Sequence, residues 1–302
     1  MSIDLVNTQG LPFFMFTDDL AYKQLSESSK NYSLQKYIRD TKMGKHQADS
    51  AETILSKNYI GMILAKIMDH YWKTQIEFSI VDIGTQYCTL SIPLANYIKS
   101  HRNSNKIYAF DCGLAGRLAE YNIKLNQLHD IITFEYKAVS NASIPHLVYY
   151  DSEHSEDNHI VKRNLVNLPS YIVDGITLDD YFNKNYKNLI LKIDAQGTEP
   201  LVFEGMQKIL HAVLPAIIFK FIPWVCRSIT EPAAFLNSLP EGYIFFNIDS
   251  KNNRLQKLTR NEFAGFVATI SVDNPPYTNI LMLHETIANI DNLINDIFKI
   301  SV

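Results

Sequence analysis

Apolar residues recur at two different periods along the chain, and the change of period separates an N-terminal region from the rest. In "NYIGMILAKIMDHYW" the apolar positions lie three and four residues apart, which is typical of one buried helix face. These positions are Ile60, Ile63, Leu64, Ile67, Met68 and Tyr71. A second, earlier helix is predicted over about residues 18–41, with a polar link over 42–52. We therefore expect residues 1–75 to form a helical cap.

From residue 78 onwards, short apolar runs alternate with helix-like segments. The predicted strands are "FSIVDI" (78–83), "KIYAFD" (106–111), "IITFEY" (131–136), "NLILKID" (188–194) and "AIIFKF" (216–221). This alternation predicts a doubly wound α/β domain over residues 76–285, with a mostly parallel sheet and helices on both faces.

The end of the chain departs from this alternation. The strands "GYIFFNID" and "TNILMLHE" (278–285) are joined by a long polar segment without a clear helix, which predicts an antiparallel hairpin at one edge of the sheet. Residues 286–302 are expected to form a C-terminal helix.

A long polar segment, residues 141–176, interrupts the strand–helix alternation. It is rich in histidine and acidic residues, and "HLVYY" is predicted to be a short strand within it. Unstructured insertions of this length are usually functional or disordered. His146, His154 and His159 lie among four acidic residues, but their spacing matches no zinc motif, so a solvated loop is favoured over a metal site. We expect no metal. We predict that the segment forms a lid, which orders over the substrate when the substrate binds.

Composition narrows the function classes further. The chain has 302 residues, 46% hydrophobic and 20% charged, as in ordinary globular proteins, and its formal net charge is −4. Nucleic acid is therefore not an expected partner. Three cysteines, Cys88, Cys112 and Cys226, do not form a disulfide framework. With neither a signal-peptide pattern nor an apolar run of membrane-spanning length, we expect a cytoplasmic protein that makes no membrane contact.

Polar residues follow three of the predicted strands, where doubly wound sheets bind their ligands. Asp82 and Gly84 close the first strand, Asp111 the second and Asp194 the fourth. An acid after the second strand is the residue type that binds a ribose diol. A dinucleotide would also need a glycine-rich pyrophosphate turn, and "DIGTQYC" offers a single glycine. S-adenosylmethionine, a nucleoside cofactor without phosphates, is therefore the expected cofactor.

Three blocks of the sequence resemble the FkbM family of S-adenosylmethionine-dependent methyltransferases. They are "VDIGTQYCTLS", "IYAFDCGLAGRLAEYNIKLN" and, most specifically, "ITLDDYFNKNYKNLILKIDAQGTEPLVFEGMQKIL". Together they span roughly residues 78–221 in the family's order. The resemblance implies a class I methyltransferase fold, Rossmann-like, with an antiparallel last strand.

The resemblance also implies roles for individual residues. It puts Asp82, Gly84 and Gln86 around the methionine end of the cofactor, with Gln86 and Tyr87 offering side-chain contacts in place of glycine. The ribose would bind Asp111, and the adenine would lie by Ala138 and Val139. It puts Asp194 at the active-site end of the fourth strand, next to the cofactor. The chain departs from the family pattern at Cys88, Cys112, Gln196 and Lys220.

The predicted function is methyl transfer, with O-methylation of a sugar or secondary-metabolite hydroxyl implied by the resemblance. Asp194 is the first candidate for the general base, and His154 or His159 the second. Gln196, Glu199 and Lys220 are predicted to face the acceptor, a small molecule, glycan or peptide. The alternatives are N-methylation of a peptide or amide, and a non-catalytic binding protein on a decayed methyltransferase fold. The N-terminal region is expected to cap the substrate side, to form a homodimer interface, or both.

Overall fold

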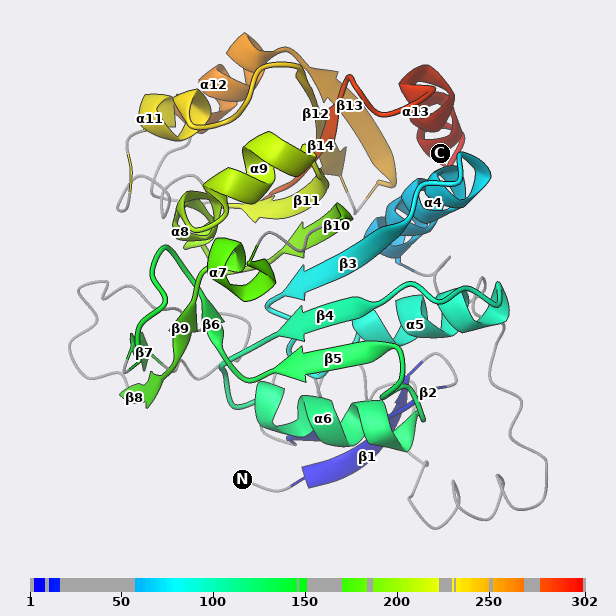
Figure 1. The fold of residues 1–302 in the computed structure, drawn as a ribbon, viewed down its shortest axis with the longest axis vertical. Coiled ribbons are helices and arrows are strands. Elements are labelled where there is room, and N and C mark those ends of the chain that lie inside the picture. The colour runs from blue at the N-terminus through cyan, green and yellow to red at the C-terminus, as the bar shows by residue number, and fades with distance from the viewer. Residues whose placement is uncertain are drawn as a thin grey trace.

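A single eight-stranded sheet forms the centre of the molecule (Figure 1). The computed structural model describes residues 3–8, 11–16, 58–145, 147–150, 170–183, 187–222, 230, 232–249, 252–268 and 278–300. The strands of the large sheet are β3 (Phe78–Ile83), β4 (Ile107–Phe110), β5 (Ile132–Glu135), β10 (Asn188–Ile193), β11 (Ala216–Phe221), β12 (Tyr243–Asp249), β13 (Arg254–Leu258) and β14 (Thr278–His284). All five strands predicted in the parallel part of the sheet are present.

The strand order is β13-β12-β14-β11-β10-β3-β4-β5. Strands β5, β4, β3, β10 and β11 pair in parallel, whereas β14 pairs antiparallel with both β11 and β12. The chain leaves β3 towards β4 on one side, and β10 lies on the other side, so strand order reverses at β3 and β10. The predicted doubly wound, mostly parallel sheet with an antiparallel last strand is therefore confirmed.

Helices cover both faces of the sheet and bury two separate apolar cores (Figure 1). One face is covered by α4 (Tyr59–Lys73), α5 (Ser91–Ser100), α6 (Gly116–Leu125) and α13 (Ile290–Phe298). The other face is covered by α7 (Leu178–Phe182), α8 (Glu199–Glu204), α9 (Gln207–Val213), α11 (Pro232–Asn237) and α12 (Arg260–Ala268). Side chains alternate between the two faces along each strand, so Ile80 and Ile190 belong to the first core and Val81 and Leu191 to the second.

The N-terminal region is only partly helical where the structure describes it. Helix α4 is present where the apolar periodicity predicted it, with the Asn58 side chain accepting from the Gly61 amide at its start. The prediction is wrong for residues 3–16, because β1 (Ile3–Thr8) and β2 (Leu11–Phe16) form an antiparallel pair. Leu11, Phe13 and Met15 recur at every second residue of β2 and are buried together in the first core, which is the period of a strand and not of a helix. The helix predicted over 18–41 lies outside the described residues.

Strand β2 is attached to α6 by two asparagine side chains. Asn122 is fully buried, and its Oδ1 accepts from the Phe14 amide at 2.6 Å while its Nδ2 donates to the Phe14 carbonyl at 3.2 Å. Asn126 donates to the carbonyl of Pro12 at 2.9 Å. The asparagine amide thus pairs with β2 as a neighbouring strand would, and it holds the N-terminal pair on the first core.

The C-terminal part of the sheet differs from the predicted edge hairpin. Strands β12 and β14 do pair antiparallel, as expected. However, β14 lies between β12 and β11 in the sheet. The segment that joins β12 to β14 along the chain contains both β13 and α12. Helix α12 follows the polar stretch of this segment and buries Phe263 in the second core. Helix α13 lies within the predicted C-terminal range.

Two short ladders extend from the segment after β5. Strand β6 (Ala138–Val139) pairs with β9 (Gly175–Ile176), and β7 (Leu147–Tyr150) pairs with β8 (Ser170–Val173). The predicted strand in "HLVYY" is therefore confirmed as β7. Within the described residues, no helix has the length and apolar character that crossing a bilayer demands.

Candidate functional site

The ends of β3 and β10 meet in a backbone contact that only glycine permits. Gly84 has φ +74°, and a Cβ atom at this position would lie 2.0 Å from the carbonyl oxygen of Asp194. The Gly84 amide donates to the Phe110 carbonyl, and the Asp194 amide donates to the Ile83 carbonyl, each at 2.9 Å. The turns after three adjacent strands are thereby joined at the point where strand order reverses, which is where doubly wound sheets bind ligands.

Asp82 lies beneath this contact and is fully buried. Its Oδ2 accepts from the hydroxyls of Ser91 at 2.6 Å and Thr85 at 2.8 Å. These bonds join the end of β3 to the following turn and to the start of α5. The carboxylate therefore holds the loop from the protein interior and is not exposed at the surface.

Lys192 is a residue of this site that the sequence analysis did not select. It lies beside Asp82 in the register of β10 and β3, and its Nζ is 3.3 Å from Asp82 Oδ1. The same ammonium donates to the Gly84 carbonyl at 3.2 Å and lies 3.8 Å from Asp194 Oδ2. Burial lowers the pKa of Lys192, but the adjacent Asp82 and Asp194 outweigh it and raise the pKa overall. A lysine inside the apolar run "NLILKI", two residues before Asp194, was the available signal.

Asp194 is the centre of a second group of polar side chains. Its Oδ1 accepts from Gln196 Nε2 at 2.9 Å and lies 3.6 Å from Lys220 Nζ. Lys220 in turn donates to Gln196 Oε1 at 3.1 Å. The structure therefore brings together three residues predicted to lie at the active site. Lys220 thus pairs with the acid that follows β10.

Asp111 ends β4 with both carboxylate oxygens bonded to backbone amides. Oδ2 accepts from the Gln86 amide and Oδ1 from the Gly113 amide, each at 2.7 Å. Burial raises the pKa of Asp111, and these two bonds act in the opposite direction. A carboxylate has about four lone-pair positions, so each oxygen keeps one for a further donor.

The loop between β3 and α5 contains non-glycine residues in left-handed backbone conformations. These are Gln86, with φ 50°, and Cys88, with φ 63°. The side chains of Tyr87 and Cys88 are both fully buried in the first core. The prediction that Tyr87 contacts the cofactor is therefore wrong, because the large apolar ring packs inward. Burial raises the pKa of the Cys88 thiol well above its usual range.

The residues predicted to flank the adenine lie next to the end of β4. Ala138 and Val139 form β6 and are buried, and Ala138 packs in one small cluster with Cys112 and Val173. Cys112 directly follows Asp111, so the predicted ribose and adenine residues are neighbours. Cys88 and Cys112 are both buried.

Glu199 is fully buried under the turn that carries Asp194. Its Oε1 accepts from the Ala195 amide at 2.9 Å, and among the described residues Oε2 has no hydrogen-bond partner. Burial raises the pKa of Glu199 to about 7, although nearby backbone amides lower it in part. Its position suits a role in holding this turn rather than contact with an acceptor.

The predicted base candidates His154 and His159, together with His146, lie outside the described residues. The described ranges contain no group of three or more histidine, cysteine or acidic residues suited to a metal ion.

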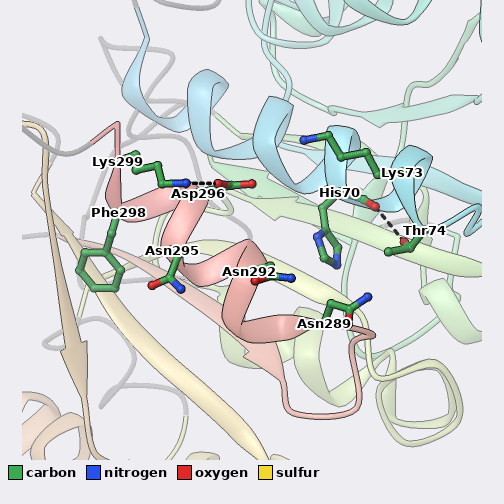
Figure 2. A pocket seen from close by; sticks show the side chains of 9 residues that line it. All are labelled: His70, Lys73, Thr74, Asn289, Asn292, Asn295, Asp296, Phe298 and Lys299. Carbon is green, nitrogen blue, oxygen red and sulfur yellow. Dashed lines mark hydrogen bonds and ion pairs between the residues drawn. The ribbon is translucent and has the colours of Figure 1, made fainter.

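An open cavity of about 760 Å³ lies at the opposite end of the sheet, between α4 and α13 (Figure 2). Its walls are polar and include three asparagines of the α13 region (Asn289, Asn292 and Asn295) together with His70. The His70 ring already donates to the Ala288 carbonyl at 2.6 Å. This cavity is far from the carboxyl ends of the parallel strands and shares none of the residues described above.

The family comparison covers the turns after β4 and β10. Residues 91–230 match the model of the methyltransferase FkbM domain. This segment belongs to the FkbM methyltransferase family. The FkbM match includes Asp111, Asp194, Gln196 and Lys220, whereas the loop of Gly84 precedes it and the last three strands follow it.

The strand order, with the antiparallel β14 inserted between β11 and β12, is that of a class I methyltransferase fold. Solved methyltransferases are among the structures to which this chain is similar. An FkbM methyltransferase from Methylobacillus flagellatus KT is 11% identical, with 87% of this chain and 76% of that chain covered and a TM-score of 0.40. The magnesium protoporphyrin IX methyltransferase from Synechocystis PCC 6803, solved with bound SAM, is 12% identical, with 88% and 91% covered and a TM-score of 0.35.

An rRNA methylase from Streptococcus thermophilus is 13% identical, with 72% of this chain and 95% of that chain covered and a TM-score of 0.35. Similarities at this level say nothing about substrate or mechanism. The chain has no significant match among curated proteins.

Proposed function

We propose that the protein is an S-adenosylmethionine-dependent methyltransferase that methylates a hydroxyl group of a sugar or secondary metabolite. The observation that carries the cofactor assignment is the position of Asp111 within a matched FkbM domain. Asp111 directly follows β4, and the next residue, Cys112, packs with Ala138. The Asp111 carboxylate keeps lone pairs for two further donors. The proposal that the acceptor is a hydroxyl group rests on the family resemblance.

The residues at the strand ends fit this cofactor better than a dinucleotide. The loop has one glycine, and Gln86 and Cys88 occupy positions where a pyrophosphate would need close backbone approach. Asp82, Asp111 and Asp194 are three carboxylates against the two ammonium groups of Lys192 and Lys220, which leaves this edge of the sheet with an excess of negative charge. When bound, S-adenosylmethionine supplies a methyl group on a positively charged sulfur.

Asp194 is the residue that meets the acceptor in this proposal. Its side chain is 29% exposed, and its orientation is held by the Gln196 amide and the Lys220 ammonium. A carboxylate held in this way can accept a hydrogen bond from the acceptor hydroxyl and take its proton during attack. Positioning of two reactants is worth several kcal/mol of the barrier, so a rigid Asp194 matters beyond its basicity.

Calorimetry with S-adenosylhomocysteine tests the cofactor assignment. Asp111→Ala should weaken binding at least tenfold, because charge-assisted hydrogen bonds are worth roughly 1.5–3 kcal/mol each. Asp111→Asn keeps one acceptor oxygen and should give an intermediate dissociation constant. If Asp111→Ala remains folded and binds with the wild-type constant, Asp111 does not hold the ribose.

The acceptor is tested separately, by labelled methyl transfer to panels of sugars, secondary metabolites and peptides. Transfer to a hydroxyl supports the proposal, whereas transfer to an amide nitrogen would establish N-methylation instead. Failure of the wild-type protein to bind either S-adenosylmethionine or S-adenosylhomocysteine would favour the non-catalytic alternative.

A further inference from the structure

Lys192 contacts three chain segments that must be fixed relative to one another for the site to form. Its Nζ lies 3.3 Å from Asp82 Oδ1 on β3, 3.2 Å from the Gly84 carbonyl in the loop, and 3.8 Å from Asp194 Oδ2 after β10. The lysine side chain is 14% exposed, so these contacts are largely shielded from solvent. One ammonium group therefore joins the base of the loop, the loop backbone and the turn at Asp194.

The charge on Lys192 is matched to the groups around it. Asp82 is fully buried, and within the described residues Oδ1 has no hydrogen-bond partner of normal geometry. Thr85 and Ser91 already occupy Oδ2, so Lys192 supplies the positive charge that Oδ1 faces. Removal of one partner of a buried ion pair leaves the other charge uncompensated, which is why such pairs resist disruption.

The loop that Lys192 contacts needs external support. Gln86 and Cys88 both adopt positive φ values, and each such residue costs on the order of 1 kcal/mol relative to glycine. Side chains from other segments hold the backbone of this loop in place. Asp111 accepts from the Gln86 amide, Asn122 donates to the Tyr87 carbonyl, and Lys192 donates to the Gly84 carbonyl.

We propose that Lys192 is a positioning residue that holds the Gly84 loop and Asp194 in their binding geometry before the cofactor arrives. This inference rests on the proposed function for its consequence in binding, although the effect on the loop itself does not depend on it. Lys192 acts through the carbonyl of Gly84 and the carboxylates of Asp82 and Asp194. The loop has a single glycine, and this side-chain support offsets the backbone strain that further glycines would relieve.

The test uses Lys192→Met alone and together with Asp82→Asn. The single variant leaves the Asp82 charge uncompensated and is expected to be unstable. The double variant removes that charge while its amide oxygen can still accept from Ser91 and Thr85. Lys220→Met is the matched comparison for the exchange measurement alone, because it also removes an ammonium beside Asp194 but leaves the contact to Gly84.

Two readouts are measured on the full chain. Amide hydrogen exchange without cofactor should be at least tenfold faster at Gly84 and Thr85 in the double variant, while the amides of β11 keep their protection. The dissociation constant for S-adenosylhomocysteine should rise at least tenfold in the double variant, while Lys220→Met should keep wild-type exchange at Gly84 and Thr85. A purely structural role would lower the melting temperature without changing either quantity in the folded protein.

The outcomes separate this inference from the proposed function. If the folded double variant keeps wild-type exchange at Gly84 and Thr85, Lys192 does not position the loop, whatever the protein binds. If exchange accelerates but wild-type protein binds no S-adenosylhomocysteine, the positioning role stands and the proposed function fails. If exchange accelerates and the dissociation constant is unchanged, the loop geometry set by Lys192 does not matter for the cofactor.

Discussion

Glu199→Gln should change how the stability of the protein depends on pH. Glu199 is fully buried, one carboxyl oxygen accepts from the Ala195 amide, and the other has no hydrogen-bond partner among the described residues. Burial and the charge of Asp194 raise the pKa of Glu199 to about 7 from its ordinary value of 4.5. The folded state therefore keeps a proton between about pH 4.5 and 7 that the unfolded chain has lost.

The size of the effect follows from this difference in pKa. Because the folded pKa is the higher one, the contribution to stability is fully present below about pH 4.5 and is lost as pH rises through 7. A pKa difference of about 2.5 at 1.36 kcal/mol per unit corresponds to about 3 kcal/mol. Glutamine stays neutral at every pH, so the variant should lack this loss.

Urea titrations of both proteins at pH 5, 6, 7 and 8 measure the prediction. The free energy of unfolding of Glu199→Gln minus that of the wild type should become more positive with pH, by about 2–3 kcal/mol over this range. Glu204→Gln, on the same helix but exposed to solvent and bonded to Asn141, is the control and should show no comparable trend. A Glu199 difference that stays constant within about 0.5 kcal/mol would refute the argument from burial.

Three further substitutions test other parts of the structure. Gly84→Ala should destabilise the protein by at least about 3 kcal/mol in chemical denaturation, because its Cβ would lie 2.0 Å from the Asp194 carbonyl oxygen at a positive φ; near-wild-type stability would contradict that contact. Asn122→Ala should cost about 2–4 kcal/mol, because the buried backbone groups of Phe14 and Tyr87 lose their partners; a loss below about 1 kcal/mol would show that β2 does not depend on it. Replacing His154 and His159 together with alanine should reduce turnover or acceptor affinity far more than cofactor affinity, and normal methylation by this variant would end the lid hypothesis.

The alternation of strands and helices was determined by the sequence itself. Short β-branched runs such as "FSIVDI" and "AIIFKF" are buried on both faces, as parallel strands between helix layers must be, so their composition alone identifies them. The residues after each strand were predictable for the same reason, because the carboxyl ends of parallel strands meet at one edge. Asp82, Asp111 and Asp194 could therefore be chosen without coordinates.

Tertiary structure decided which of these carboxylates are enclosed by the protein and which are left partly exposed. The sequence places Asp82 and Asp111 near the ends of neighbouring predicted strands, yet Asp82 is fully enclosed by Ser91, Thr85 and Lys192. The importance of Lys192 depends on strand register, since only the pairing of β10 with β3 sets it beside Asp82. These two residues are about 110 positions apart in the sequence. Their register arises from packing across the whole sheet and not from any local pattern.

The errors at the two ends of the chain have a similar cause. Strands β1 and β2 pair with each other, and β2 packs on α6 through Asn122. This contact joins segments too far apart for a local period to reveal. Strand β14 is inserted between β11 and β12, and a pattern of apolar residues specifies that a strand is buried without specifying its neighbours. Local sequence thus determines the elements and the residue types at their ends, whereas long-range pairing determines the partners that give those residues their roles.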